Sequence, residues 1–389
     1  MTKIHIIYPN YIAKDGKGMS VGGIQTYLSN LIDLIKDKGL GVSLYQTADY
    51  DFHINVDGLD VYACKLEKGT DVSQALYEKC KEYLQEDDII IFGTDFQIIK
   101  TECKRVIGIQ HGISWDIPMY EIGNGNFAYL KSFCRKALNA WRRNKCIQNA
   151  NKVVCVDHNF VNWYRAVVPF PQTNFTVIPN FTDIPEEREF VDKEDVRIIF
   201  ARRFFTYRGT RLFANVIERI LKNHNNVYVT FAGEGPDEEY IRNKFIGNDK
   251  VTITKYNSNE SLKIHKKHDI AVVPTIGSEG TSLSLLEAMA SGCAAVCSNV
   301  GGMTNIILDG FNGIIFDPYN EDDLYYAIER LVKDKNDCIR LITAKEAERL
   351  QTLPENYTDG IATTQRFKAI GNGWTVDGIA HIFKGLTAY

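Results

Sequence analysis

Short apolar runs alternate with amphipathic stretches along most of the chain. Because parallel strands are buried on both faces, they are typically continuous apolar runs, and helices between them cover the sheet. A first series of such runs occupies residues 3–8, 88–92, 105–109 and 152–156, and a second occupies 197–200, 227–233, 251–254, 269–274 and 294–298. Helical periodicity is present at 24–38, 212–221 and 322–333. The pattern predicts an α/β protein with two doubly wound, Rossmann-like domains.

A polar, proline-bearing segment at 179–195 separates the two series and has the composition of a linker. We therefore expect a first domain over residues 1–185, a second over 186–340 and a separate tail over 341–389. Doubly wound sheets bind ligands at the carboxyl ends of their strands. Two facing domains therefore place the expected active site in the cleft between them.

The composition and charge of the chain exclude several classes of protein. The 389 residues are 44% hydrophobic and 24% charged, which is typical of a folded multi-domain chain. The net charge of −4 argues against a uniformly basic nucleic-acid coat but leaves room for a local basic patch. No apolar run reaches the roughly 18 residues of a membrane span, and the first residues do not resemble a signal peptide. Nine cysteines without C-x-x-C pairs are typical of free thiols. We expect a soluble cytoplasmic protein.

The segment 274–302 contains the most specific chemistry. Glu279 lies in a polar loop after an apolar strand, and Glu287 follows eight residues later inside an apolar helix that should end at Gly292. Carboxylates accept hydrogen bonds from sugar hydroxyls. The alternative is a solvated Glu279 and a salt-bridged Glu287. Amides at the start of this helix favour a phosphate or diphosphate, and they belong to Gly280, Thr281, Ser282 and Leu283.

Residues 274–292 resemble the E-x7-E signature of the retaining GT-B glycosyltransferases of family GT4. Further segments resemble that family in the family's own order. Phe181 replaces a usual Gly, and Arg208 stands where Lys is usual. The resemblance covers about residues 3–338, and its further segments are VGGIQTYLSNL (21–31), IQHG (109–112), VIPNFTD (177–183), FARRFFTYRG (200–209) and AGEGPDEEYI (232–241).

This resemblance implies a GT-B fold and transfer of a hexose from a nucleoside diphosphate sugar, with a UDP-sugar such as UDP-glucose as the default donor. The anomeric configuration would be retained by front-face attack, in which the leaving phosphate accepts the acceptor's proton. No cofactor or metal is expected. The lone D-x-D at Asp49 and Asp51 is interpreted as surface, because no other feature of metal-dependent transferases accompanies it.

The resemblance also assigns residue roles. Arg203 and Arg208 would neutralise the departing diphosphate with permanent charge. Glu287 would bind the ribose and Glu279 the donor sugar, while His111 would donate a hydrogen bond near the reacting sugar; the alternative is a His satisfied at a strand end. The remaining expected contacts are Gly22 and Gly23 on the diphosphate and Asp116 on the acceptor.

The last residues differ from the rest. Segments 343–360 and 364–383 resemble the C-terminal end of C5-cytosine DNA methyltransferases. The catalytic Pro-Cys loop and the cofactor-binding start of those enzymes have no counterpart here, so methylation is excluded. The alternative is a closing segment of the GT-B fold that packs on the body. A methyltransferase-like tail suggests a gene beside viral DNA-modification genes, and hence 5-hydroxymethylcytosine in DNA as acceptor.

A basic helix is expected in the first domain. Residues 122–156 contain no Asp or Glu. Apolar residues recur there at helical spacing, and we expect Arg142 and Arg143 to contact the acceptor's phosphates. Alternatively, the helix contacts anionic lipid, and the acceptor is a lipid-linked or cell-surface glycan. A further alternative is that the basic side chains form only a solvated helix face. A non-catalytic DNA-binding or scaffold module is the alternative of another class. The basic residues are Lys131, Arg135, Lys136, Arg142, Arg143, Lys145 and Lys152, and the apolar ones are Leu130, Phe133, Cys134, Ala137, Leu138 and Trp141.

Overall fold

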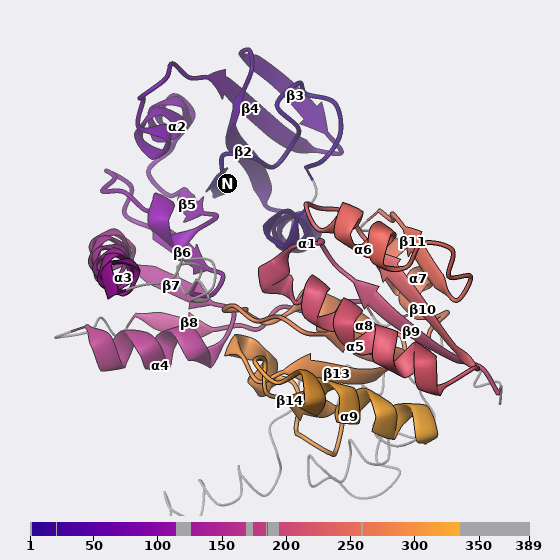
Figure 1. The fold of residues 1–389 in the computed structure, drawn as a ribbon. Helices are drawn as coiled ribbons and strands as arrows, with labels where there is room; N and C mark the ends of the chain where they lie inside the picture. Colours follow the sequence, from indigo (N-terminus) through magenta and orange to yellow (C-terminus); the bar gives the residue numbers. More distant parts are fainter. Residues whose placement is uncertain are drawn as a thin grey trace, which may run out of the picture.

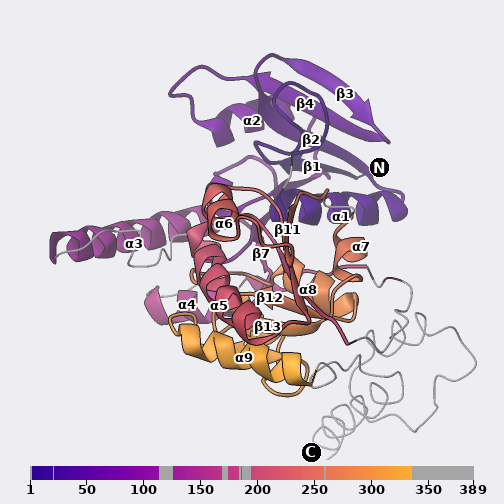
Figure 2. The same ribbon diagram turned by 45° about the vertical axis from the view of Figure 1, so that its right-hand side comes forward.

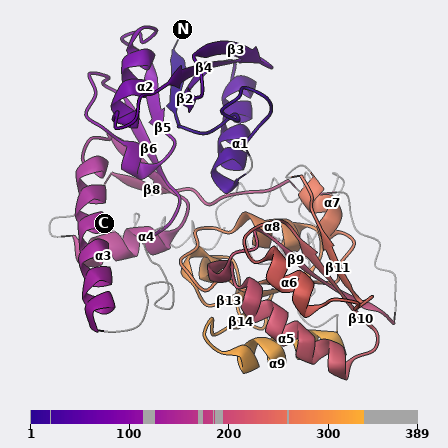
Figure 3. The same cartoon turned by 45° about the horizontal axis from the view of Figure 1, so that its top comes forward.

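Two parallel sheets, each covered by helices, make up the described part of the chain (Figure 1). The computed structural model describes residues 2–20, 22–113, 126–168, 174–183, 185, 194–257 and 260–334. Figure 3 separates the two domains, with α1 pointing from the first domain toward the second. The two-domain, doubly wound architecture predicted from the alternation of strands and helices is confirmed. The methyltransferase-like tail lies outside the described residues.

The first sheet has eight strands in the order β3-β4-β2-β1-β5-β6-β7-β8, and only the β3–β4 pair is antiparallel. Its strands are β1 (Lys3–Ile7), β2 (Gly41–Ala48), β3 (Phe52–Val56), β4 (Leu59–Lys65), β5 (Ile89–Phe92), β6 (Val106–Gln110), β7 (Lys152–Cys155) and β8 (Phe175–Val177). Its helices are α1 (Gly23–Asp37), α2 (Val72–Lys81), α3 (Asn126–Ile147), α4 (His158–Val167) and the short 3₁₀ helix η1 (Asp95–Gln97).

The second sheet has six parallel strands in the order β11-β10-β9-β12-β13-β14. Its strands are β9 (Val196–Ala201), β10 (Val227–Ala232), β11 (Val251–Thr254), β12 (Ile270–Val273), β13 (Ala294–Ser298) and β14 (Ile314–Phe316). Its helices are η3 (Thr206–Arg208), α5 (Thr210–Asn223), α6 (Glu238–Lys244), α7 (Ser261–His265), α8 (Leu283–Ala290), η5 (Gly301–Asn305) and α9 (Glu321–Lys333).

Burial on both faces explains the continuous apolar runs. Successive side chains of a strand point to opposite faces. In β1, Ile6 packs in one core with α1 and Ile7 in another with α2 and α4. In β9, Phe200 packs against α5 and α9 while Ile199 packs on the side of α8. Both neighbours in each pair are fully buried, which explains why two successive positions are both apolar.

The sequence analysis missed β2, β3, β4, β8 and β14. Two of them form a hairpin whose turn uses Asp57 at φ 49° and Gly58 at φ 83°. Positive φ at both central residues suits a tight hairpin, for which Asp-Gly is a preferred pair. Among the described residues, no helix is long and apolar enough to cross a membrane.

Candidate active site

The loop between β12 and α8 carries the first carboxylate of the predicted site, and α8 carries the second. Helix α8 begins at Leu283 with Ser282 as its N-cap, and Gly292 adopts φ 76° two residues after the helix ends. A left-handed Gly is a common helix terminator. These bounds agree with the prediction from the sequence. The helix N-terminus therefore points its free amides at the carboxyl end of the sheet.

Glu279 is held by two guanidinium groups and a hydroxyl. Its Oε2 accepts hydrogen bonds from Arg202 Nη2 at 2.9 Å, from Thr275 Oγ1 at 3.1 Å and from Arg208 Nη1. The Glu279 side chain is only 14% exposed. Burial alone would raise its pKa, but Arg208 and Arg202 outweigh burial and bring the pKa to about 2. Glu279 is therefore an ionised, fixed acceptor, which excludes the solvated alternative.

Arg203 occupies a different position from Arg202. Its side chain is exposed, and a Cβ added to Gly22 of the first domain would lie 3.4 Å from Arg203 Nη2. Arg203 therefore faces the start of α1 across the cleft, while Arg202 and Arg208 face Glu279. The sequence analysis had assigned Arg203 and Arg208 to one diphosphate, and it missed Arg202 and Thr275 altogether.

Several segments of the first domain converge on the N-terminus of α8. A Cβ on Gly23 would lie 3.8 Å from Leu283 Cδ1, and a Cβ on Gly112 would lie 3.0 Å from the Gly280 nitrogen. Thr281 Oγ1 donates to the Val156 carbonyl, and Asn180 Nδ2 donates to the Thr281 carbonyl at 2.6 Å. These contacts join the start of α1 and the ends of β6, β7 and β8 to the second domain.

His111 follows β6 and is neutral. Its Nε2 donates to the Gly93 carbonyl at 2.9 Å, and its ring packs edge-on against Tyr27. Burial lowers the pKa of His111 to about 4. Since a carbonyl only accepts, Nε2 carries the proton and Nδ1 carries the lone pair. In this geometry the only N–H of the ring is already used, so the nitrogen left for a ligand is an acceptor rather than the expected donor.

Glu287 lies in α8, and its side chain has a hydroxyl group as its hydrogen-bond partner. Ser261 Oγ donates to its Oε2 at 2.6 Å. Burial raises the pKa of Glu287 to about 6, although the Ser261 hydrogen bond lowers it. Within the described residues Glu287 forms no ion pair, so the salt-bridged alternative does not hold there. A buried carboxylate with one hydroxyl partner retains acceptor capacity for further hydroxyl groups.

Residues 182–348 match the family model described as "Glycosyl transferases group 1". This match spans all six strands of the second sheet, both glutamates and the three arginines described above.

Curated proteins that resemble this chain are named as glycosyltransferases. An uncharacterized glycosyltransferase of Methanocaldococcus jannaschii, MJ1607, is 30% identical over 148 residues, which are 37% of this chain and 37% of the relative. The chain thus spans little more than a third of that relative. MJ1178 of the same organism is 22% identical over 81% of this chain and 86% of its own length. An Escherichia coli UDP-Gal:alpha-D-GlcNAc-diphosphoundecaprenol alpha-1,3-galactosyltransferase is 22% identical over 59% and 60%.

Solved structures identify the fold as GT-B. Sucrose-phosphate synthase from Thermosynechococcus elongatus superposes with a TM-score of 0.71 at 16% identity and covers 100% of both chains. Anabaena HepE, solved in complex with UDP and glucose, superposes with a TM-score of 0.64 at 14% identity, again over 100% of both. At these identities the likeness concerns the fold.

Helix η5 supports the loop that carries Glu279. Gly302 N donates to the Glu279 carbonyl at 2.9 Å. Gly301 adopts φ 52°, and a Cβ there would lie 1.9 Å from the Glu279 carbonyl oxygen. Only Gly fits this approach. The V-G-G sequence at the start of η5 is the signal from which this support could have been predicted.

Arg142, Arg143 and Asp116 are the residues that we expected to contact the acceptor. Arg143 Nη1 pairs with Asp95 Oδ1 at 2.5 Å, with both side chains nearly buried, and its guanidinium stacks on Phe96. Its charge is thus neutralised inside the first domain and is not a free phosphate contact as we had expected. Arg142 is exposed as predicted for a contact residue. Asp116 lies outside the described residues.

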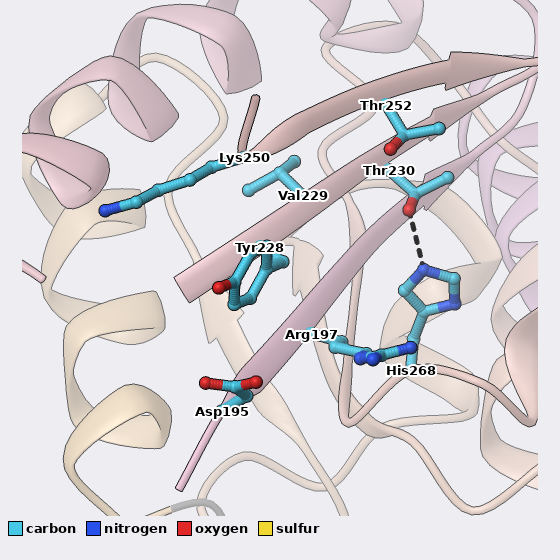
Figure 4. A pocket seen from close by; sticks show the side chains of 8 residues that line it. All are labelled: Asp195, Arg197, Tyr228, Val229, Thr230, Lys250, Thr252 and His268. Atoms are coloured by element: carbon cyan, nitrogen blue, oxygen red, sulfur yellow. Dashed lines mark hydrogen bonds between the residues drawn. The ribbon is translucent and has the colours of Figure 1, made fainter. Parts of the chain in front are cut away.

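A separate polar groove of about 410 Å³ lies at the opposite end of the second sheet (Figure 4). It is lined by the starts of β9, β10 and β11, including Arg197 and Tyr228, and by His268, whose Nε2 is 2.8 Å from Thr230 Oγ1. Open α/β sheets bind ligands at the carboxyl ends of strands, so this groove is not part of the candidate active site. Substitutions in it can therefore serve as controls. Among the described residues, no group of three or more His, Cys, Asp or Glu could hold a metal ion.

Proposed function

We propose that the chain transfers a hexose from a nucleoside diphosphate sugar to a hydroxyl acceptor with retention of anomeric configuration. The observation that carries this proposal is the close approach of the glycines at the start of α1, Arg203, the Arg208–Glu279 pair and the amides at the start of α8. A diphosphate needs such a set, because helix amides and guanidinium groups both favour negative charge.

Each group has a proposed role toward the donor. The diphosphate lies between Arg203 and the amides of Gly23 and Leu283, and Arg208 neutralises its distal charge. Glu279 accepts hydrogen bonds from hydroxyls of the donor sugar, and Glu287 accepts them from the ribose. UDP-glucose is the first donor to test, since the HepE structure contains UDP and glucose. No metal is part of this proposal.

The proposed reaction needs no protein base. The bond between the sugar's anomeric carbon and the phosphate oxygen breaks, and the acceptor oxygen forms a new bond to that carbon on the same face. The acceptor's proton passes to the leaving phosphate oxygen. The negative charge that develops on the nucleoside diphosphate is stabilised by Arg203 and Arg208. The neutral, already bonded His111 supports a positioning role. A non-catalytic module would have no use for this matched set of charges.

For the acceptor, we propose a lipid-linked or cell-surface glycan. The Escherichia coli relative is named for a diphosphoundecaprenol-linked acceptor, and α3 presents apolar and basic side chains outward. The second candidate is the hydroxymethyl group of 5-hydroxymethylcytosine in DNA. The absence of acidic residues over 122–156 favours it, together with the resemblance of the tail to DNA methyltransferases.

The experiment is to incubate the full chain with UDP-glucose and other nucleoside diphosphate sugars beside three acceptors: a diphosphoundecaprenol-linked saccharide, 5-hydroxymethylcytosine DNA and unmodified DNA. Mass spectrometry measures the product and the released nucleotide. We expect hexose on the lipid-linked acceptor with its anomeric configuration retained. Transfer only to hydroxymethylated DNA replaces the first acceptor with the second. No transfer and no nucleotide release with any donor would contradict the proposed function.

A further inference from the structure

A helix that covers a core turns its large apolar side chains inward, whereas α3 turns most of them outward. Apart from Ile147 in the last turn, which is fully buried, its inward face is small or polar. Ser132 and Ala140 are buried there, and Asn144 Oδ1 accepts a hydrogen bond from Tyr164 at 2.6 Å. Arg143 fastens the same face to η1 through Asp95. Figure 2 shows α3 projecting from the side of the first domain.

The outward face of α3 carries the large apolar side chains. Phe127 is 83% exposed, Leu130 55%, Phe133 62%, Leu138 45% and Trp141 54%. Soluble proteins rarely leave a contiguous apolar stripe of this kind uncovered. Except for Phe127, these residues belong to the apolar set that their helical spacing predicts, but spacing does not tell which way such a set faces. We name these five residues the α3 stripe.

Basic side chains border the α3 stripe. Lys131, Arg135, Arg142 and Lys145 are exposed, and Lys145 Nζ lies 3.9 Å from the centre of the Trp141 ring. Helix α3 contains no Asp or Glu, and Lys131, Arg135 and Arg142 form no ion pair within the described residues. Aliphatic stems of Lys and Arg can lie along apolar surface while their charges reach a polar boundary.

An apolar stripe edged by positive charge complements the surface of an anionic membrane. A helix of 22 residues is roughly 33 Å long and would lie in the interface plane, with rings and leucines among the acyl chains and the cations at the lipid phosphates. Duplex DNA offers phosphates but no apolar partner for Phe127, Leu130 and Leu138 at the same face. The stripe therefore favours lipid over DNA.

We propose that the outward face of α3 is a docking surface for an anionic lipid membrane. Docking goes beyond the proposed transfer reaction and does not depend on it. The apolar stripe supplies most of the affinity, and the bordering cations select anionic over zwitterionic lipid. The surface brings the first domain to the membrane, where a lipid-linked acceptor would be found.

The test is co-sedimentation of the full chain with vesicles of phosphatidylcholine alone and of phosphatidylcholine with phosphatidylglycerol. We expect binding to the anionic vesicles, weakened by added salt. Burying one leucine side chain is equivalent to about a tenfold change in a binding constant or more. The double variant Leu130→Gln/Leu138→Gln should therefore reduce partitioning by about a hundredfold, and Lys131→Glu/Arg135→Glu should abolish the preference for anionic lipid.

The matched control is Ile246→Gln in the second domain, where Ile246 is 84% exposed and should not affect binding. Wild-type binding by Leu130→Gln/Leu138→Gln, equal binding to both lipid mixtures, or binding to duplex DNA but to neither vesicle would overturn the docking surface. Nucleotide release from UDP-glucose in solution, measured on the same samples, separates the two proposals. Vesicle binding without release in any condition contradicts the transferase alone, and release without vesicle binding contradicts the docking surface alone.

Discussion

Arg202 is the residue whose removal most sharply tests the charge network around Glu279. The Glu279 carboxyl has an ordinary pKa of 4.5 and a pKa of about 2 in the folded protein. That difference corresponds to about 3 kcal/mol of favourable interaction with the ionised form. Arg208 and Arg202 supply it together against the cost of burial. Arg202→Ala removes one of the two cations and leaves Arg208, so we expect the free energy of unfolding at neutral pH to fall by about 2 kcal/mol.

The pH dependence gives the same prediction a second readout. A carboxyl with a depressed pKa stabilises the fold above its unfolded pKa of about 4.5, and this contribution is lost as the pH falls toward about 2. Without Arg202 the pKa of Glu279 should rise toward its ordinary value. The contribution of Glu279 at neutral pH is then smaller, and less of it remains to be lost in acid. The difference in stability between wild type and variant should therefore shrink below about pH 4.

Urea unfolding followed by far-ultraviolet circular dichroism, from neutral pH down to pH 3, measures both effects. Arg203→Ala is the matched control, because Arg203 is the next residue but has an exposed side chain, and exposed substitutions usually change stability by about 0.5 kcal/mol or less. Wild-type stability in Arg202→Ala, or the same loss in Arg203→Ala, would refute the assignment of Arg202 to Glu279.

Four further predictions follow from the site. Arg203→Ala should reduce kcat/KM for the donor by the equivalent of about 2–4 kcal/mol, and full activity would contradict its role. The KM for the donor should rise about tenfold between neutral pH and pH 5 as Glu287, with a pKa of about 6, becomes protonated; Glu287→Gln should remove that dependence in the same steady-state assay. Gly301→Ala should lower the free energy of unfolding, measured in urea, by at least about 1–2 kcal/mol, because Ala disfavours the left-handed backbone of this residue. Gly310→Ala is the control for this backbone cost alone, since Gly310 has φ 71° but open space around it. Transfer should persist after treatment with a chelator, and its complete loss would point to a bound metal.

The sequence predicts the second sheet better than the first for a physical reason. Strands β9, β12 and β13 are buried at nearly every position and are nearly continuous apolar runs. Strand β2 is buried too, but Ser43 and Gln46 interrupt it. The Gln46 side chain accepts hydrogen bonds from the amides of Tyr11 and Ile12, at 3.2 and 2.7 Å. A buried amide satisfied by a loop more than thirty residues away cannot be recognised from local periodicity.

The sequence motifs predict which residues belong to the candidate site, but they do not predict which of these residues contact one another. The resemblance of the sequence motifs points to Glu279, Glu287 and Arg208, and the structure brings Arg208 onto Glu279. Two adjacent arginines, Arg202 and Arg203, look equivalent in a sequence, and only the backbone path after β9 sends one to Glu279 and the other to the cleft. The pairing of Arg143 with Asp95 is likewise a tertiary contact, and it removes from the basic face one charge that the sequence analysis had counted there.

Titration of the full chain with UDP by calorimetry tests the central claim, that a nucleotide sugar binds between the two domains, most directly. The account predicts binding that Arg203→Ala weakens by about tenfold or more, the equivalent of at least 1.4 kcal/mol. It predicts wild-type affinity for Arg197→Ala, which alters only the groove at the opposite end of the same sheet (Figure 4). UDP binding that survives Arg203→Ala but is lost in Arg197→Ala, or no UDP binding at all, would contradict it.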